Sequence, residues 1–186
     1  RLQLRKDLEA ALAKVKGKPW WSLGMATVAE FVRQEKGADN LVRAYAIAQK
    51  GQQAFPESIG GKRCHHIARS ITAPSYSTEA MGSDNHKRSS LAINYRNLER
   101  MYFRAYPFDI KSYIEKSDDY YIFPNQSRVE RFVRGNKAAA SWHIDLEKTV
   151  DYKTHRAFSQ VPVEKDGFYV VVSSANSEFS RDNNVM

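Results

Sequence analysis

The sequence predicts an α+β protein, in which α-helical hairpins at the N-terminus lead into an antiparallel β-sandwich. Apolar residues recur every three or four positions up to about residue 72, and at alternate positions after Pro74. Hydrophobic residues make up 42% of the 186 positions, which is enough to form a core. We therefore expect a repeat-like helical lead-in over 1–72 and a sandwich over 73–186 that lacks its last strand.

The first two predicted helices cover about 4–15 and 22–36. Gly17 and Pro19 end the first, Ser22 is the expected N-cap of the second, and Gly37 ends it. Their expected inward positions are Leu4, Leu8, Leu12, Val15, Met25, Val28, Phe31 and Val32.

A helical hairpin follows. Asp39 or Asn40 is placed to cap its first helix and Pro56 to break it, and a second helix covers about 58–71. Such hairpins are the building unit of helical repeat arrays. The inward positions are Leu41, Ala44, Tyr45, Ala48 and Phe55 in the first helix, and Cys64, Ile67, Ala68 and Ile71 in the second.

The second part alternates with a period of two in several short segments, which is typical of strands with one buried face. We predict strands around 90–96, 101–106, 142–147 and 168–173, separated by turns such as 82–85 and 96–99. The stretch 109–137 is interpreted as a long connection with a helical turn, and 182–186 as a turn entering another strand. The expected core residues are Leu91, Ile93, Tyr95, Met101, Phe103, Ala105, Trp142, Ile144 and Leu146.

We expect no metal site and no cofactor. Cys64, His65 and His66 are consecutive, and on a helix consecutive side chains point about 100° apart, so they cannot share one ion. Cys64 lies on the apolar stripe and is interpreted as a buried structural thiol. The other histidines lie on separate predicted elements: His86, His143 and His155.

We also expect no catalytic residues, so the chain is interpreted as a non-enzyme. The Gly60-Gly61-Lys62 run lacks the first glycine and the Ser/Thr of a phosphate-binding loop. The carboxylate pairs Asp118-Asp119 and Asp145/Glu147 are explained by solvent-facing positions. Exposed aromatics in 109–123 are the expected partner-binding surface.

The net charge of +8 is concentrated in the helical part, since residues 1–72 hold 13 Lys/Arg against 6 Asp/Glu, a net +7. The basic residues are spread over several helices rather than clustered with aromatics, which argues against nucleic acid. No stretch approaches the ~20 apolar residues of a membrane span, so we expect no direct membrane insertion by this chain.

Several segments together resemble the N-terminal part of the large bacterial α2-macroglobulin-like proteins. They are 55–64, the strand pair Tyr95-Arg96-Asn97 and Tyr102-Phe103-Arg104, and the strand 167–174, Gly-Phe-Tyr-Val-Val-Val-Ser-Ser. The resemblance covers roughly residues 40–186. It implies a helical lead-in followed by a fibronectin/Ig-like sandwich, the macroglobulin domain.

The resemblance also implies a function as part of a protease trap, an endopeptidase inhibitor that closes around a protease. Cys64 is followed by two histidines, so the thioester motif of many family members is not found here, and no family catalytic residue can be assigned. The chain would be an extracytoplasmic scaffold fragment, periplasmic or at the cell surface, whose partners are neighbouring domains of the same protein and the parent protein's target proteases. The alternatives are an Ig-like adhesion or recognition module of a surface protein, and an accessory domain of an enzyme.

Overall fold

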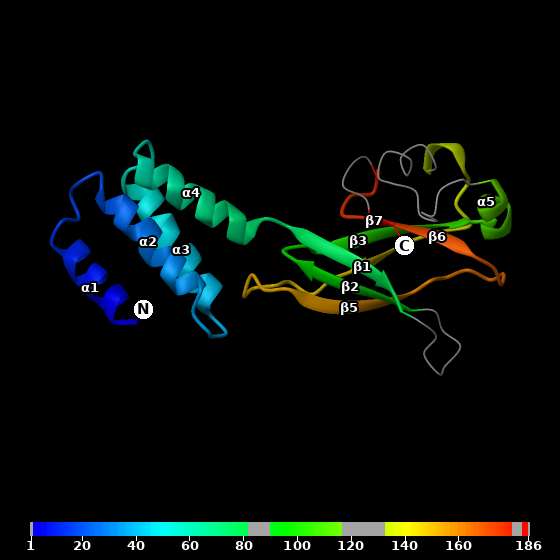
Figure 1. Ribbon diagram of the computed structural model, residues 1–186, viewed down its shortest axis with the longest axis horizontal. Helices are drawn as coiled ribbons and strands as arrows, with labels where there is room; N and C mark the ends of the chain where they lie inside the picture. Colours follow the sequence, from blue (N-terminus) through cyan, green and yellow to red (C-terminus); the bar gives the residue numbers. More distant parts are fainter. Residues whose placement is uncertain (1, 82–89, 117–132, 180–183, 186) are drawn as a thin grey trace. The chain divides into compact units, whose positions relative to one another are not determined.

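The computed structural model describes residues 2–81, 90–116, 133–179 and 184–185. The chain is α+β, with helices and two antiparallel sheets (Figure 1). Its contacts divide it into two compact units, which we call the helical unit and the β unit. The helical unit comprises Arg1–Pro74 together with Thr149–Lys153, and the β unit comprises Ser75–Lys148 and Thr154–Met186. The short segment Thr149–Lys153 thus groups with the helices, although it lies between two strands in the sequence.

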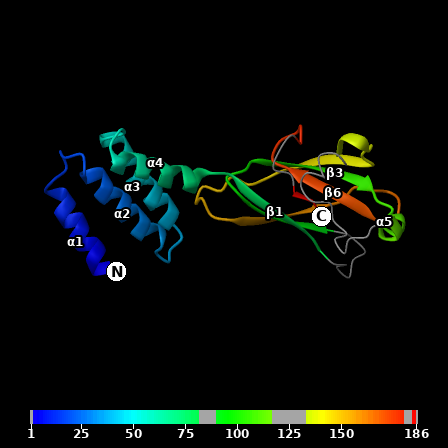
Figure 2. The same cartoon turned by 45° about the horizontal axis from the view of Figure 1, so that its top comes forward.

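The helical unit contains four helices: α1 (Leu2–Ala13), α2 (Trp21–Arg33), α3 (Asn40–Ala54) and α4 (Ile59–Thr72). Helices α2, α3 and α4 pack against one another, and α1 lies beside α2 (Figure 2). The predicted stripe of α4 is confirmed, because Cys64, Ile67, Ala68 and Ile71 are all buried. None of the described helices is long and apolar enough to cross a membrane.

Small residues dominate the places where these helices meet. Ala26, Ala29, Ala44 and Ala48 are buried, and Gly60 lies directly on the backbone of α2. A Cβ added at position 60 would lie 2.1 Å from the backbone nitrogen of Leu23, closer than real Cβ atoms come to any neighbour. Backbone-to-backbone contact of this kind excludes any larger side chain there.

Three predictions about the helices are wrong. Gly37 does not end α2, because the C-cap of this helix is Gln34. Leu4, expected to face inward, is exposed, because α1 packs through Leu8 and Leu12 instead. Ser22 is not an N-cap, since α2 begins one residue earlier at Trp21. Its hydroxyl is buried and donates a hydrogen bond to the carbonyl of Gly51 at 2.7 Å, so it links α2 to α3.

Within its described residues, the β unit contains a three-stranded sheet in the order β1-β2-β5 and a four-stranded sheet in the order β4-β3-β6-β7, and all neighbouring strands are antiparallel. A short helix, α5, follows β3. The bounds are β1 (Ser75–Ala80), β2 (Ser90–Arg96), β3 (Arg100–Pro107), α5 (Ile110–Lys116), β4 (Ala140–Asp145), β5 (His155–Gln160), β6 (Tyr169–Ser174) and β7 (Asn184–Val185).

Residues from both sheets share one hydrophobic core. Strand β2 contributes Leu91, Ile93 and Tyr95, and strand β3 contributes Met101, Phe103 and Ala105, as the alternating pattern predicted. Polar contacts also join the sheets. Trp142 Nε1 donates to Ser159 Oγ at 2.9 Å, Thr78 Oγ1 lies 2.9 Å from Ser173 Oγ, and the Tyr76 hydroxyl donates to the carbonyl of Ser173 at 3.3 Å. The predicted inward-facing residues Trp142 and Ile144 of β4 pack against this core while remaining partly exposed.

The connections agree only in part with the sequence-based expectation. The predicted helical turn after residue 109 is α5, and the predicted strand near the end of the chain is β7. Strand β5 was not predicted. Phe168, placed in the last long strand, is exposed and precedes β6. The predicted turn at 82–85 lies outside the described residues.

Candidate functional site

Cys64 is a buried structural thiol in this structure, as predicted. Its Sγ donates to the carbonyl of Ser22 at 3.3 Å, and a Cβ at Gly51 would lie 2.5 Å from it. Burial raises the pKa of the Cys64 thiol to about 11, with a smaller opposing effect from the positive charge of Arg63. A reactive cysteine needs the opposite, a pKa lowered toward neutrality and access to solvent.

The described histidines do not come together. His65 and His66 are exposed on α4, and Nδ1 of His65 lies 3.0 Å from the amide nitrogen of Gln52. His143 on β4 and His155 on β5 belong to different sheets, and each lies about 6.1 Å from a tyrosine ring of the neighbouring strand. His86 lies outside the described residues. Over the part of the chain that the structure describes, no three His, Cys, Asp or Glu side chains are grouped to hold a metal ion.

The two glycines before Lys62 serve helix packing at the start of α4. The hydroxyl of Ser58 caps this helix and accepts a hydrogen bond from the backbone nitrogen of Gly61 at 3.0 Å. A Cβ at Gly61 would lie 2.0 Å from the carbonyl oxygen of Phe55. The need for close approach therefore explains both glycines without a bound phosphate.

The carboxylates singled out in the sequence do not form a pair. Asp145 ends β4 and Glu147 lies just beyond the strand, and both are exposed, as the predicted solvent-facing positions require. Arg100 Nε donates to Asp145 at 2.6 Å, and this bond lowers the pKa of the aspartate. Asp118-Asp119 lies outside the described residues.

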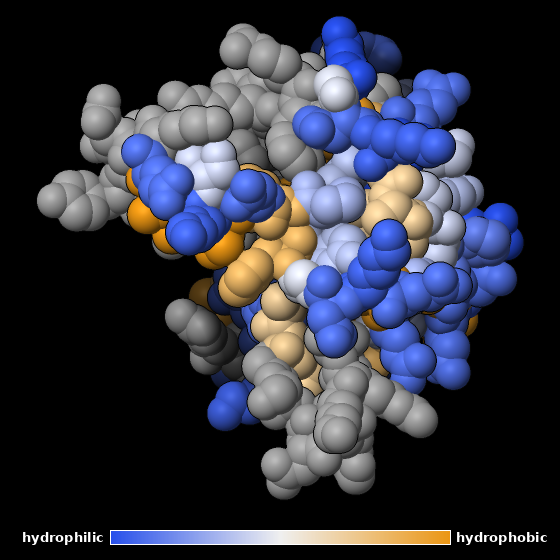
Figure 3. All heavy atoms as spheres, turned by 90° about the vertical axis from the view of Figure 1, so that its right-hand side faces the viewer, coloured by the Kyte–Doolittle hydropathy of each residue, from blue (hydrophilic) through white to orange (hydrophobic). Residues whose placement is uncertain are grey.

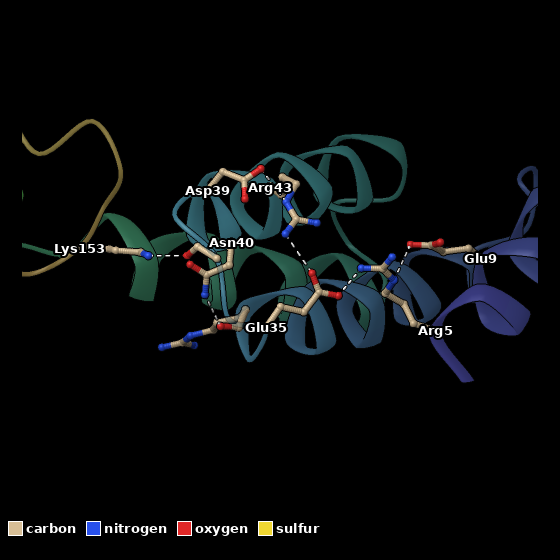
Figure 4. A network of polar contacts seen from close by, with 9 residues as sticks. Arg5, Glu9, Glu35, Asp39, Asn40, Arg43 and Lys153 are labelled. Carbon is tan, nitrogen blue, oxygen red and sulfur yellow. Dashed lines mark hydrogen bonds and ion pairs between the residues drawn. The ribbon is translucent and has the colours of Figure 1, made fainter. Parts of the chain in front are cut away.

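A network of polar side chains links α1, α2 and α3 (Figure 4). Glu35, just after α2, accepts from Arg5 of α1 and, at 2.9 Å, from Nη2 of Arg43 of α3. Arg5 also pairs with Glu9, and Arg43 with Asp39, each one helical turn away. The bond to Glu35 raises the pKa of the Arg43 guanidinium further above neutrality. This network joins the three helices, and in it two arginines pair with three carboxylates, those of Glu9, Glu35 and Asp39.

The segment Thr149–Lys153 is attached beside this network. Lys153 Nζ donates to the carbonyl of Gly37 at 2.5 Å (Figure 4). The ring of Tyr152 lies 5.3 Å from that of Tyr45 on α3. The i,i+4 pairs of the network are visible in the sequence. The central role of Glu35 and the docking of residues 149–153 are not, because both depend on contacts between distant segments.

The aromatic stretch 109–123 is only partly described. The ring of Tyr113 lies 5.3 Å from that of Phe108, while Ile114 and Phe168 are exposed. Figure 3 views the molecule from the end that carries α5 and shows apolar side chains among hydrophilic ones. Residues 117–123 of this predicted binding surface lie outside the described residues.

Comparison of the chain with protein-family models, with curated proteins and with solved structures found no match. The class of protein is therefore defined by the fold alone: an α+β protein with a helical unit and two antiparallel sheets that share a core.

Proposed function

We propose that this chain is a non-catalytic scaffold module of a large extracytoplasmic α2-macroglobulin-like protease-trap protein. In this proposal the β unit is the macroglobulin domain, a fibronectin/Ig-like sandwich, and the helical unit is its lead-in. The chain would bind neighbouring domains of the same protein, and the assembled parent protein would enclose target proteases.

The strand order is the observation that carries the proposal. An Ig-like sandwich places strands A, B and E in one sheet and C, F and G in the other, with C′ beside C in some variants. With the seven strands of the described residues lettered A, B, C, C′, E, F and G in chain order, the two sheets read A-B-E and C′-C-F-G. In this lettering β7 takes the place of strand G, the last strand, which the sequence analysis expected the sandwich to lack. This arrangement supports the sandwich class that the sequence resemblance implies.

The polar chemistry of the described residues supports a scaffold role. The thiol of Cys64 is buried with a raised pKa, and the carboxylates of Glu35 and Asp145 are each bound to arginine. A nucleophile, a base and an orienting group within mutual reach would favour an enzyme instead. The shifted pKa values here are explained by burial in the packed core and by contacts between helices or between strands.

The proposal is tested by incubating the purified 186-residue chain with a protease in equimolar amounts. We expect unchanged cleavage of both a large protein substrate and a small peptide substrate, because trapping requires several domains that close together. Stoichiometric loss of cleavage of both substrates would contradict the proposal and indicate an inhibitor that occupies the protease active site directly.

The full coding sequence separates the proposal from an Ig-like adhesion or recognition module. We expect it to encode further sandwiches of this strand order and an exposed segment that proteases cleave. An array of Ig-like domains with a surface-sorting signal and no such cleavable segment would contradict the trap and favour adhesion.

A further inference from the structure

Three apolar side chains are exposed where α2 and α4 begin. Ile59, the first residue of α4, is 82% exposed, Trp20 is 55% exposed, and Leu23 is 39% exposed. Each lies in the first turn of its helix or directly before it. Single exposed apolar residues are common, but neighbouring ones that include a tryptophan indicate a surface with a binding partner.

The packing of Gly60 places these three residues together. Gly60 lies against the backbone of Leu23, and Ile59 directly precedes Gly60. The backbone nitrogen of Leu23 donates to the carbonyl of Trp20 at 3.0 Å, so these two residues lie within one turn. Figures 1 and 2 show α2 and α4 beginning at the same end of the helical unit.

Basic side chains flank the three apolar ones, which corrects the expectation that basic residues are not clustered with aromatics. Lys16 and Lys18 precede Trp20, Lys62 and Arg63 follow Ile59, and all four are exposed. Across 14–23 and 50–63 there are six Lys/Arg and one acidic residue, Glu57, which pairs with Lys62 at 3.4 Å. We call the set of seven residues the apolar-basic end: Lys16, Lys18, Trp20, Leu23, Ile59, Lys62 and Arg63.

The composition of the apolar-basic end favours a lipid surface over a protein partner. Lysine is depleted at protein–protein interfaces, where arginine is preferred, yet three of the four basic residues here are lysines. Lysine combined with exposed tryptophan, leucine and isoleucine is typical of surfaces that rest in the headgroup region of anionic bilayers. Tryptophan suits that region because its ring is apolar and its N–H is polar.

We propose that the apolar-basic end binds the surface of an anionic lipid bilayer. The lysines and Arg63 contact the acidic headgroups, while Trp20, Leu23 and Ile59 enter the boundary between headgroups and acyl chains. No segment crosses the bilayer in this arrangement. The proposal is independent of the protease trap, because it concerns a surface of the helical unit alone.

The test is co-sedimentation of the 186-residue chain with lipid vesicles. Vesicles of phosphatidylcholine and phosphatidylglycerol in equal parts should bind the chain, with weaker binding as salt is raised, and phosphatidylcholine vesicles should not. Binding should also shift the fluorescence of Trp20 to shorter wavelength. Trp20→Phe should remove most of that shift while the protein still sediments, since Trp21 is buried and Trp142 belongs to the β unit.

Two matched variants locate the binding surface. Lys18→Glu with Ile59→Ser should weaken binding to the mixed vesicles by about tenfold or more. Lys165→Glu with Phe168→Ser removes one exposed lysine and one exposed apolar residue from the β unit, and should leave binding unchanged. Far-ultraviolet circular dichroism checks that both variants fold.

Three results would overturn the proposal. The first is no binding to the mixed vesicles at low salt. The second is equal weakening by the two paired variants, which would indicate attraction by overall charge. The third is complete displacement of the chain from the vesicles by polyglutamate, together with no loss of vesicle binding when Ile59 is replaced. This result would indicate an acidic protein partner instead.

Discussion

The two units of this protein form their cores in opposite ways. In the helical unit five of the twelve buried core residues are alanines, and small residues let the backbones approach until Gly60 lies on the backbone of Leu23. In the β unit the core is made of large side chains, with the ring of Phe103 stacked on that of Trp142 at 5.2 Å. The stability of the helical unit should therefore fall most when a substitution adds side-chain volume, and that of the β unit when a substitution removes it.

The largest expected effect is that of removing volume from the β unit. Phe103 is buried, so Phe103→Ala leaves a cavity between the sheets and should cost about 3–5 kcal/mol of unfolding free energy. Denaturant unfolding followed by the tryptophan signal measures this. Phe158→Ala is the matched control, because Phe158 is 58% exposed and should change stability little. Equal midpoints for Phe103→Ala and the parent chain would contradict the shared core.

Adding one methyl group should have nearly as large an effect in the helical unit. In Gly60→Ala the new Cβ would meet the backbone of α2, so we expect a cost of about 3 kcal/mol, because two backbones must separate. Unfolding followed by the circular dichroism signal of the helices measures this loss of stability. Gly17→Ala is the control, since nothing lies within 4 Å of a Cβ at that position. Equal stability of the two variants would show that α2 and α4 do not pack closely.

The protonation of Cys64 reports on the same packing of α4 against α2. Its pKa is raised from 9.0 to about 11 in the folded state, so folding favours the neutral thiol. The stabilisation is complete below pH 9 and is lost as the pH rises toward 11. We expect the unfolding midpoint of the helical unit to fall over this range by more than it does in Cys64→Ala, and thiol labelling at neutral pH to be slow. Rapid labelling of the native chain would contradict a buried thiol.

The smallest effect concerns one of the hydrogen bonds between the sheets, the one from Trp142 to Ser159. Trp142→Phe keeps a ring stacked on Phe103 but removes the donor to Ser159, and should cost about 1 kcal/mol. Ser159→Ala should have a similar effect, and the double variant should cost less than the sum of the two. Additive costs would show that the two side chains do not interact.

Much of each unit could be predicted from the sequence, wherever the spacing of apolar residues within one element decides the structure. The stripe of α4 and the alternation of β2 and β3 follow from the spacing of apolar residues, and the structure agrees. Strand β5 was missed because its most apolar residue, Phe158, points to solvent, so its sequence shows no strand alternation. Ser22 was misassigned because a serine near a helix start usually caps it, whereas here the hydroxyl serves a buried contact to Gly51.

In the candidate sites, too, only the features that depend on a local sequence pattern could be predicted. The buried state of Cys64 could be predicted, since it needs only the helical period. The position of Glu35 between Arg5 and Arg43 could not, because it joins residues from three helices. The exposure of Trp20 and Ile59 was also unpredictable, since it depends on what the neighbouring helices leave uncovered.

The most direct test of the protease-trap proposal is a comparison of substrate sizes with the full-length parent protein. A protease held in a cage of domains still reaches small peptides but not large proteins. We therefore expect the parent protein to block cleavage of a large protein substrate while leaving cleavage of a small peptide unchanged, and Phe103→Ala in the parent to weaken that block. Equal inhibition of both substrates, or of neither, would contradict the account.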